Sequence, residues 1–152
     1  MSGRRIKSLF VSLGRLWKII KMKSKLIYLA SPYSHPKKHV RLRRWHDITL
    51  IGALLIQKGH HVFGPITESH CYSEIHDQIG KGWDFWKKHD ELMLSKCDEL
   101  WVVLLEGWKD SAGVAGEINY AKKNKLPIKY LEPVHLLEGH THKLNFVEPR
   151  LL

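Results

Sequence analysis

The stretch ELWVVLLEGWKDSAGVAGEINYA, residues 99–121, places a strand, a turn and a helix in direct succession. Its first seven residues form an apolar-rich run typical of a central strand that is buried on both faces. A turn at 107–111 follows, and one helical face is then formed by Val114, Ile118 and Ala121. A strand that leads at once into a helix is the unit from which parallel α/β sheets are built.

The same alternation of short apolar runs and helical spacing continues on both sides of this stretch. We expect strands at 25–30, 60–63, 99–105 and 126–132, helices at 37–58, 83–96 and from the turn to residue 125, and a long loop at 64–82. This alternation predicts an α/β, doubly wound fold, flavodoxin- or Rossmann-like, with a parallel sheet of four to five strands and helices on both faces. Ligands of such folds bind beyond the carboxyl ends of the strands, so we expect one crevice shared by the loops at 30–35, 64–70 and 106–113.

The chain has 152 residues, which suits one folded domain with a core of its own. We divide it into a basic amphipathic N-terminal extension at 1–24, a domain at 25–133 and a C-terminal tail at 134–152. The formal net charge is +10, but residues 1–25 alone carry eight lysines and arginines and no acid. The remaining domain is only mildly basic, so we expect no specific nucleic-acid partner.

Cysteine and histidine spacing indicates neither a disulfide framework nor a metal site. Cys71 and Cys97 form no C-x-x-C pair, and two cysteines in a domain of this size are typical of a reduced, cytoplasmic setting. The histidines have no ligand-like spacing. We therefore expect a cytoplasmic protein that uses no metal and no other cofactor.

The N-terminal extension contains apolar residues at helical spacing among its basic residues, namely Ile6, Leu9, Phe10, Leu13, Leu16, Trp17 and Ile20. Arg15 and Lys18 interrupt this pattern, so the segment is too charged to span a bilayer. Three interpretations remain: contact with a membrane surface or an acidic partner, a helix docked on the domain, or a weakly structured extension.

Two carboxylates occupy positions where a helix is expected to face the interior. Glu117 lies three residues after Val114 on the helix that follows the turn. Asp90 lies four residues after Trp86 and four before Leu94. Because a buried charge is costly, such positions favour a function, and two carboxylates beside one crevice suit acid–base or nucleophilic chemistry. The structural alternative is a pair of buried acids that arginines or backbone groups satisfy.

Several side chains near the same crevice are candidates for contact with a ligand. Tyr33 follows the first strand, where its hydroxyl could orient a carboxylate. Ser111 can cap the helix that follows it, hold a ligand oxygen, or do both. Its helix start, like the one at 34–38, favours anions such as phosphate. Arg41 and Arg44 begin close enough to the crevice to meet a phosphate as well.

Four stretches carry a resemblance to a known family: IYLASPYSHP, GHHVFGPITESH, HDELMLSKCDELWVV and EGWKDSAGVAGEINYA. Over residues 25–133 the chain resembles the nucleoside 2-deoxyribosyltransferase-like superfamily, most closely an uncharacterised branch found in phages and bacteria. The resemblance implies cleavage of the N-glycosidic bond of a 2′-deoxynucleoside 5′-monophosphate, or of a deoxynucleoside, through a carboxylate nucleophile and a carboxylic general acid. Deoxyribosyl transfer between bases is the alternative reaction within the family.

The resemblance also implies roles for individual residues. It implies three catalytic residues: Glu117 in a G-x-x-x-E-x-x-x-A setting, Asp90 eight residues before Asp98, and Tyr33. Ser111 stands six residues before the glutamate, where monophosphate hydrolases carry serine and transferases carry aspartate. The residues expected to bind substrate are Ser31, Pro32, Ser34, His35, Pro65, His70, Ser111 and Gly113.

The chemistry of the two acids can be stated without the family. Loss of a base from a deoxyribose leaves positive charge at C1′, which a carboxylate beneath it can stabilise or trap. We expect Glu117 to stay ionised near the positive end of its helix. We expect Asp90, between apolar neighbours, to have a raised pKa and to hold a proton for the leaving base.

The expected partner is a small nucleoside or nucleotide, but two rival functions remain open. One is a non-catalytic nucleotide-binding or sensor module that uses the same crevice. The other is a membrane- or nucleic-acid-associated adaptor that acts through the basic N-terminus. The family is commonly dimeric or larger, and Trp45, Trp83 and Trp86 are of a type enriched at interfaces, so we also expect a homo-oligomer.

Overall fold

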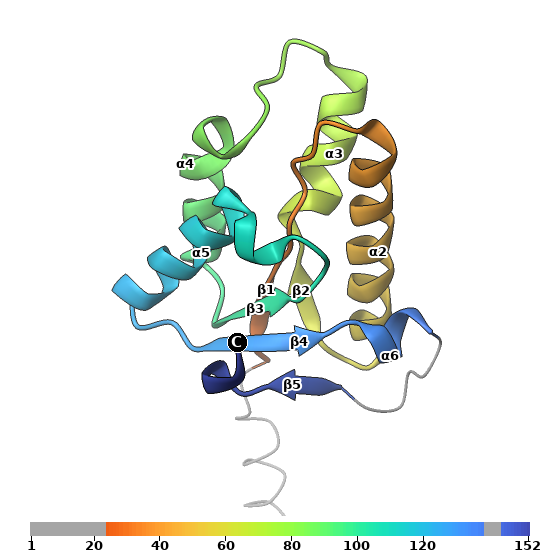
Figure 1. The fold of residues 1–152 in the computed structure, drawn as a ribbon. Helices are drawn as coiled ribbons and strands as arrows, with labels where there is room; N and C mark the ends of the chain where they lie inside the picture. The colour runs from red at the N-terminus through yellow and green to blue at the C-terminus, as the bar shows by residue number, and fades with distance from the viewer. Residues whose placement is uncertain (1–23, 139–143) are drawn as a thin grey trace, which may run out of the picture.

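The computed structural model describes residues 24–138 and 144–152, which build one five-stranded sheet flanked by helices. The strands are β1 (Leu26–Ala30), β2 (His61–Phe63), β3 (Glu99–Val103), β4 (Ile128–Glu132) and β5 (Asn145–Val147). Their order in space is β2-β1-β3-β4-β5, with the first four strands parallel and β5 antiparallel to β4 (Figure 1). The expected α/β fold with a largely parallel sheet is confirmed.

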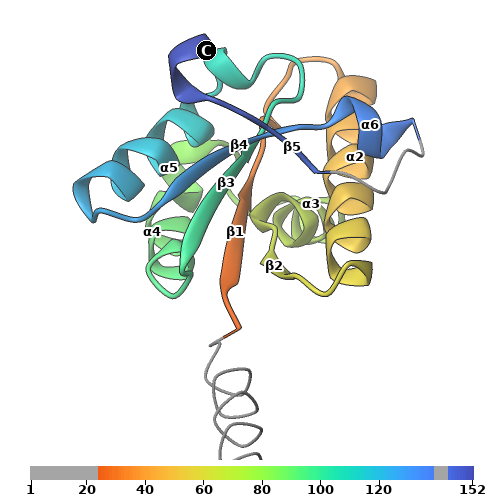
Figure 2. The same cartoon turned by 90° about the horizontal axis from the view of Figure 1, so that it is seen from below.

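The helices cover both faces of this sheet. They are α2 (Lys38–Gln57), α3 (Pro65–Ile75), α4 (Trp83–Leu94), α5 (Ala112–Lys123) and the short α6 (Val134–Leu137), with 3-10 turns at Trp108–Asp110 and Pro149–Leu151. In both views α2 and α3 lie on one side of the strands, and α4 and α5 lie on the other (Figures 1 and 2). This two-sided covering is the doubly wound arrangement that the alternation predicts.

Side chains of the central strands alternate between two apolar layers. In β1, Ile27 and Leu29 belong to the layer packed under α2. Tyr28 and Ala30 belong to the layer packed under α4 and α5. Because successive side chains of a strand face opposite sides, a strand covered on both faces needs an unbroken apolar run. The runs in β1 and β3 therefore follow from their central places in the sheet.

The expected long loop at 64–82 is wrong over its first half, because α3 occupies Pro65–Ile75. Pro65 stands at the first helical position, where its fixed φ and missing N–H suit a helix start. The inner face of α3 carries polar side chains, since Ser69 and His70 are buried. A helix with a polar inner face has no apolar period, and hydropathy alone therefore does not reveal it.

The C-terminal tail also contributes structure that its sequence pattern does not show. Strand β5 pairs with β4 so that Phe146 lies opposite Leu131. The ring of Phe146 meets Trp101 edge-on, with centroids 4.9 Å apart. A strand of three residues is too short to display a period, so this edge of the sheet is visible only after folding.

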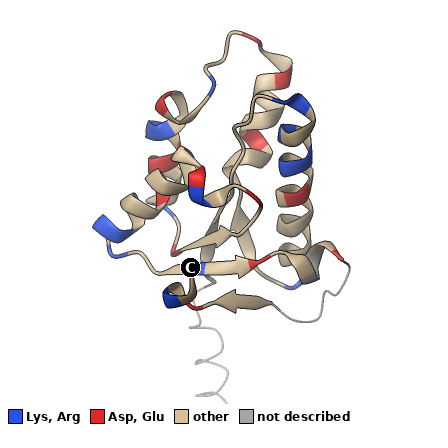
Figure 3. Cartoon of the chain, in the orientation of Figure 1, with Lys and Arg blue, Asp and Glu red and all other residues tan. Residues whose placement is uncertain are grey.

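The expected N-terminal extension lies almost entirely outside the described residues, which begin at Ser24. Within residues 24–138 and 144–152, no helix is both long enough and apolar enough to cross a membrane. Lysines and arginines gather on the first turns of α2 (Figure 3).

The connections of β1 and β3 leave in opposite directions. From β1 the chain passes through α2 to β2 on one side, and it then returns through α3 and α4 to β3 on the other side of β1. Neighbouring strands whose connections diverge leave a crevice beyond their carboxyl ends, and doubly wound folds bind ligands there.

Candidate functional site

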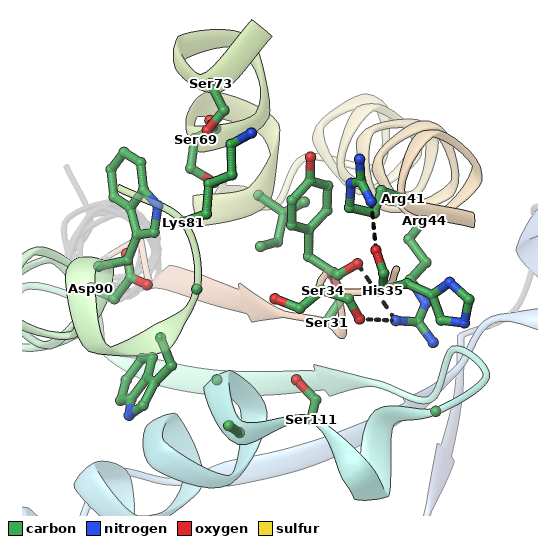
Figure 4. A pocket seen from close by; sticks show the side chains of 18 of the residues that line it. Ser31, Ser34, His35, Arg41, Arg44, Ser69, Ser73, Lys81, Asp90 and Ser111 are labelled. Carbon is green, nitrogen blue, oxygen red and sulfur yellow. Dashed lines mark hydrogen bonds between the residues drawn. The ribbon is translucent and has the colours of Figure 1, made fainter. Parts of the chain in front are cut away.

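A cavity of about 890 Å³ lies at this divergence of β1 and β3. Ser31 from the loop after β1, Ile66 from α3 and Ser111 from the loop after β3 all line it. The three loops that the sequence analysis expects to share a crevice therefore do share it. Asp90 lies on one side of the cavity, and the arginines at the start of α2 lie on the opposite side (Figure 4).

Glu117 of α5 lines this cavity although only 5% of its surface is exposed. Val114 and Ala121 on the same helix face are buried as well, which draws Glu117 inward. The hydroxyl of Tyr28, a fully buried residue of β1, donates a 2.8 Å hydrogen bond to Oε1 of Glu117. Tyr28 is not among the site residues predicted from the sequence. The available signal was a hydroxyl inside the apolar run LIYLA, since a buried hydroxyl requires a partner.

Asp90 of α4 is buried and lines the same cavity. Burial raises the pKa of Asp90 to about 6, and the nearby His89 opposes this shift. The raised pKa agrees with the expectation for a carboxyl set among apolar neighbours. Asp90 and Glu117 come close because α4 and α5 pack against each other on one face of the sheet.

The pKa of Glu117 is raised further, to about 8, mainly by burial. The hydrogen bond from Tyr28 lowers this pKa, and the charge of Asp90 raises it. This shift opposes the expectation that Glu117 is ionised at neutral pH. A helix start is worth about 1 kcal/mol to a carboxylate, whereas full burial costs several times that.

The two carboxyls titrate as a coupled pair. Burial raises the pKa of both carboxyls, and the charge of Asp90 adds to the rise at Glu117. The pair therefore keeps its protons to a higher pH than two exposed carboxyls would.

A family model described as a domain of unknown function, DUF1937, matches residues 25–132. The chain belongs to the DUF1937 family. No curated protein matches the chain. The matched DUF1937 domain begins one residue before β1 and ends with β4, so it contains every residue that lines the cavity.

Most of the residues expected to act on a substrate meet in the cavity of the DUF1937 domain. Those that line it are Glu117, Asp90, Tyr33, Ser31, Ser34, His35, Ser111 and Gly113. Pro32, Pro65 and His70 are buried and do not line it. Ser111 also caps α5, because its Oγ accepts a 3.4 Å hydrogen bond from the amide of Val114. The buried Oγ of Ser31 finds no hydrogen-bond partner among the described residues.

The hydroxyl of Tyr33 bonds to a histidine and not to a carboxylate. It lies 2.7 Å from Nδ1 of His70, and the ring of His70 stacks on Trp45 with centroids 4.5 Å apart. Burial lowers the pKa of His70, which favours its neutral form. Tyr28 therefore has the carboxylate-orienting position that the sequence analysis gave to Tyr33. Trp45, one of the three tryptophans expected at an interface, makes this contact with His70 within its own chain.

Several residues that line the cavity in the DUF1937 domain were not predicted as site residues, namely Ser69, Ser73, Glu74, Lys81, Trp83 and Trp86. The first three lie on α3, which was expected to be a loop. Their signal was a helical spacing that runs through Ile66, Ser69 and Ser73 after an N-terminal proline. Within the described residues, no group of three or more His, Cys, Asp or Glu side chains is placed to hold a metal ion.

Trp83 is fitted closely against α5. A Cβ added at Gly116 would lie 2.2 Å from Cζ2 of Trp83, whereas one at Gly113 would lie 3.8 Å from the same ring. Gly116 therefore makes room for the indole beside Glu117. Together with Trp86, this ring gives the Asp90 side of the cavity a flat apolar surface.

Proposed function

We propose that the DUF1937 domain cleaves the N-glycosidic bond of a 2′-deoxynucleoside 5′-monophosphate, with the free deoxynucleoside as the alternative substrate. One observation carries this proposal. Two buried carboxyls, Glu117 and Asp90, line one cavity, and burial raises the pKa of both. The resemblance of four sequence stretches to the nucleoside 2-deoxyribosyltransferase-like superfamily supports the same reaction.

Glycosidic cleavage needs what such a pair supplies. As the C1′–N bond breaks, its electron pair leaves with the base and positive charge develops at C1′. One carboxylic acid gives its proton to the departing nitrogen, and the other group, as a carboxylate, stabilises or bonds to C1′. Water then adds at C1′ and returns a proton to the pair, and any bond between C1′ and the carboxylate breaks with its electron pair going to the carboxylate, which releases the free sugar. Two carboxyls that share one proton therefore supply both groups.

In this proposal Glu117 faces C1′ and Asp90 faces the base. Because the pKa of Glu117 is the higher of the two, the proton must pass from Glu117 to Asp90 or to the base before Glu117 acts. Positive charge at C1′ lowers the pKa of a carboxyl beneath it and so favours this transfer. The Tyr28 hydroxyl supports it too, because its hydrogen bond favours ionised Glu117.

The remaining lining supports a monophosphate as substrate. Arg41 and Lys81 contribute positive charge, and Ser111 lies at the start of α5, where anions are favoured. Trp83 and Trp86 offer flat apolar surface for a base. Serine at position 111, which the family resemblance links to the hydrolases, favours hydrolysis over transfer.

The test is incubation of the full chain with a panel of deoxynucleosides and their 5′-monophosphates, with chromatography for released base. We expect faster release from the monophosphates, and a fall of about a hundredfold or more for Glu117→Gln. Incorporation of an added free base as fast as sugar is released would replace hydrolysis by transfer. Binding of the panel without any released base would favour the non-catalytic module.

A further inference from the structure

Arg44 joins the two loops that form the mouth of the cavity. It lies in α2, half-buried, and its guanidinium reaches past the carboxyl ends of β1 and β3. Nη1 donates a 2.9 Å hydrogen bond to the carbonyl of Ser34, in the loop after β1 (Figure 4). Nη2 donates a 2.9 Å hydrogen bond to the carbonyl of Glu106, in the loop after β3. The planar guanidinium of Arg44 therefore joins two loops that lie about seventy residues apart in sequence.

Gly107 lies against the guanidinium of Arg44. Its φ is +85°, a conformation that side chains rarely adopt, and an added Cβ would lie 2.5 Å from Nη2 of Arg44. Gly59 provides a comparison within the same chain, because its φ is +88° but an added Cβ would meet nothing within 4 Å. A side chain at position 107 would therefore displace the Arg44 guanidinium, whereas one at position 59 would meet only the demand of its backbone conformation.

The two hydrogen bonds of Arg44 lie beyond the last paired residues of β1 and β3. The pairing of β1 with β3 ends at Ala30 and Val102, so the loops beyond these residues lack ladder hydrogen bonds to each other. The first loop carries Ser31 and Tyr33, and the second leads to α5 with Glu117. Their separation decides how a ligand held by the first loop is presented to that carboxyl.

A direct role for Arg44 in phosphate binding fits its contacts poorly. Both terminal nitrogens already donate to backbone carbonyls, which leaves fewer of the five N–H groups of the guanidinium for a phosphate. Arg41, one turn earlier, donates to the carbonyls of His35 and Pro36, which belong to the same loop. Arg41 therefore braces one loop, and Arg44 spans two.

We propose that Arg44 is a positioning residue, which fixes the distance between the loops after β1 and β3 and thereby aligns substrate with Glu117. The catalytic part of this inference rests on the proposed function. The structural part, a bridge between two loops, does not depend on it and can be measured without a substrate.

The structural part is tested by hydrogen exchange with mass spectrometry on the full chain without ligand. In Arg44→Lys, which keeps the charge and loses the fork, we expect peptides covering 31–37 and 104–111 to exchange together, about tenfold faster than in the wild type. Gly107→Asn, which tolerates the left-handed backbone but pushes on the guanidinium, should do the same. Gly59→Asn and Arg43→Lys are the matched controls and should leave both peptides unchanged. Faster exchange in one peptide alone, or in neither, would overturn the bridge.

The catalytic part is tested by kinetics on the substrate found with the panel. We expect Arg44→Lys to lower kcat about tenfold and to change KM by less than about threefold, because each loop still binds its part of the substrate while alignment is lost. A raised KM with unchanged kcat would mean that Arg44 binds substrate directly, and the positioning role would be wrong. A wild type without turnover would remove the proposed function, while the exchange result would still decide the bridge.

Discussion

The hydroxyl of Tyr28 lies 2.8 Å from Oε1 of Glu117, and this bond links strand β1 to helix α5 inside the protein. Only 5% of the Glu117 surface is exposed, and none of the Tyr28 surface is. Burial raises the pKa of Glu117 to about 8, and the Tyr28 hydrogen bond acts against this rise. Burial therefore favours the protonated form of Glu117, and the Tyr28 hydrogen bond favours the ionised form.

Replacing Tyr28 with Phe should raise the pKa of Glu117 above its present value of about 8. The phenyl ring keeps the packing, so the loss in stability should be about 1 kcal/mol, the worth of one hydrogen bond. In the pH–rate profile of kcat, the limb assigned to Glu117 should move to higher pH. Tyr130→Phe, at a strand tyrosine outside the cavity lining, is the control and should leave the profile in place. A profile that stays unchanged in Tyr28→Phe would contradict the role of this bond.

Replacing Asp90 with Asn should have the opposite effect on Glu117. The charge of Asp90 raises the pKa of Glu117, so removing that charge should lower it below about 8. Turnover should also fall, most strongly on substrates whose leaving base must be protonated. The pH dependence of kcat for the two variants, measured side by side, checks this prediction. Shifts of the same sign in Tyr28→Phe and Asp90→Asn would refute it.

Replacing Glu117 with Gln should separate stability from activity. The folded-state pKa of Glu117, about 8, lies above its ordinary value of 4.5. At a pH between these two values, Glu117 is protonated in the folded protein and ionised in the unfolded chain. The free energy of unfolding therefore falls as pH rises, by at most about 1.4 kcal/mol per pH unit. Glutamine does not ionise, so Glu117→Gln should lack this fall in the free energy of unfolding. The variant should therefore be more stable than the wild type near pH 8 while its turnover falls about a hundredfold.

Urea unfolding of the wild type and Glu117→Gln at about pH 5 and about pH 8 measures this difference. The two proteins should be similar in stability at the lower pH and should diverge at the higher one. A variant that is several kcal/mol less stable at both pH values would instead identify Glu117 as a structural partner.

Replacing Gly116 with Ala should displace Trp83, because the new Cβ would lie 2.2 Å from its ring. Alanine favours a helix by about 1 kcal/mol over glycine, but overpacking of this kind costs about 1–3 kcal/mol. We expect a net loss of stability, a change in tryptophan fluorescence and a raised KM. Gly52→Ala is the matched control, since its Cβ would make only ordinary contacts at 3.9 Å, and it should be neutral or stabilising. Equal behaviour of the two variants would mean that the close fit of Trp83 is unimportant.

A shortened chain that starts at Met22 should keep the thermal midpoint of the full chain to within about 2 °C. The regular pattern of strands and helices begins at residue 25, and the family match begins there as well. Differential scanning calorimetry of both chains checks this expectation. A midpoint that falls by about 10 °C would show that the first residues pack on the domain.

Periodicity was enough to predict the central part of the fold. Strand β3 appears as an unbroken apolar run because it is covered on both faces, and α5 appears as Val114, Ile118 and Ala121 because one helical face meets the sheet. Helix α3 escaped this reasoning because its inner face carries Ser69 and His70. Ser69 lines the cavity and His70 bonds to the Tyr33 hydroxyl, so neither position had a reason to be apolar.

The sequence by itself determined that Glu117 and Asp90 lie on the inward faces of their helices, because helical spacing ties each of them to buried apolar neighbours. It could not determine their partners or their protonation. The Tyr28 bond joins residues 89 positions apart, and it exists only because β1 and α5 meet across one layer of the core. The pKa order of the two acids was likewise decided by tertiary structure, because desolvation depends on every element packed around a carboxyl and not on its helix alone.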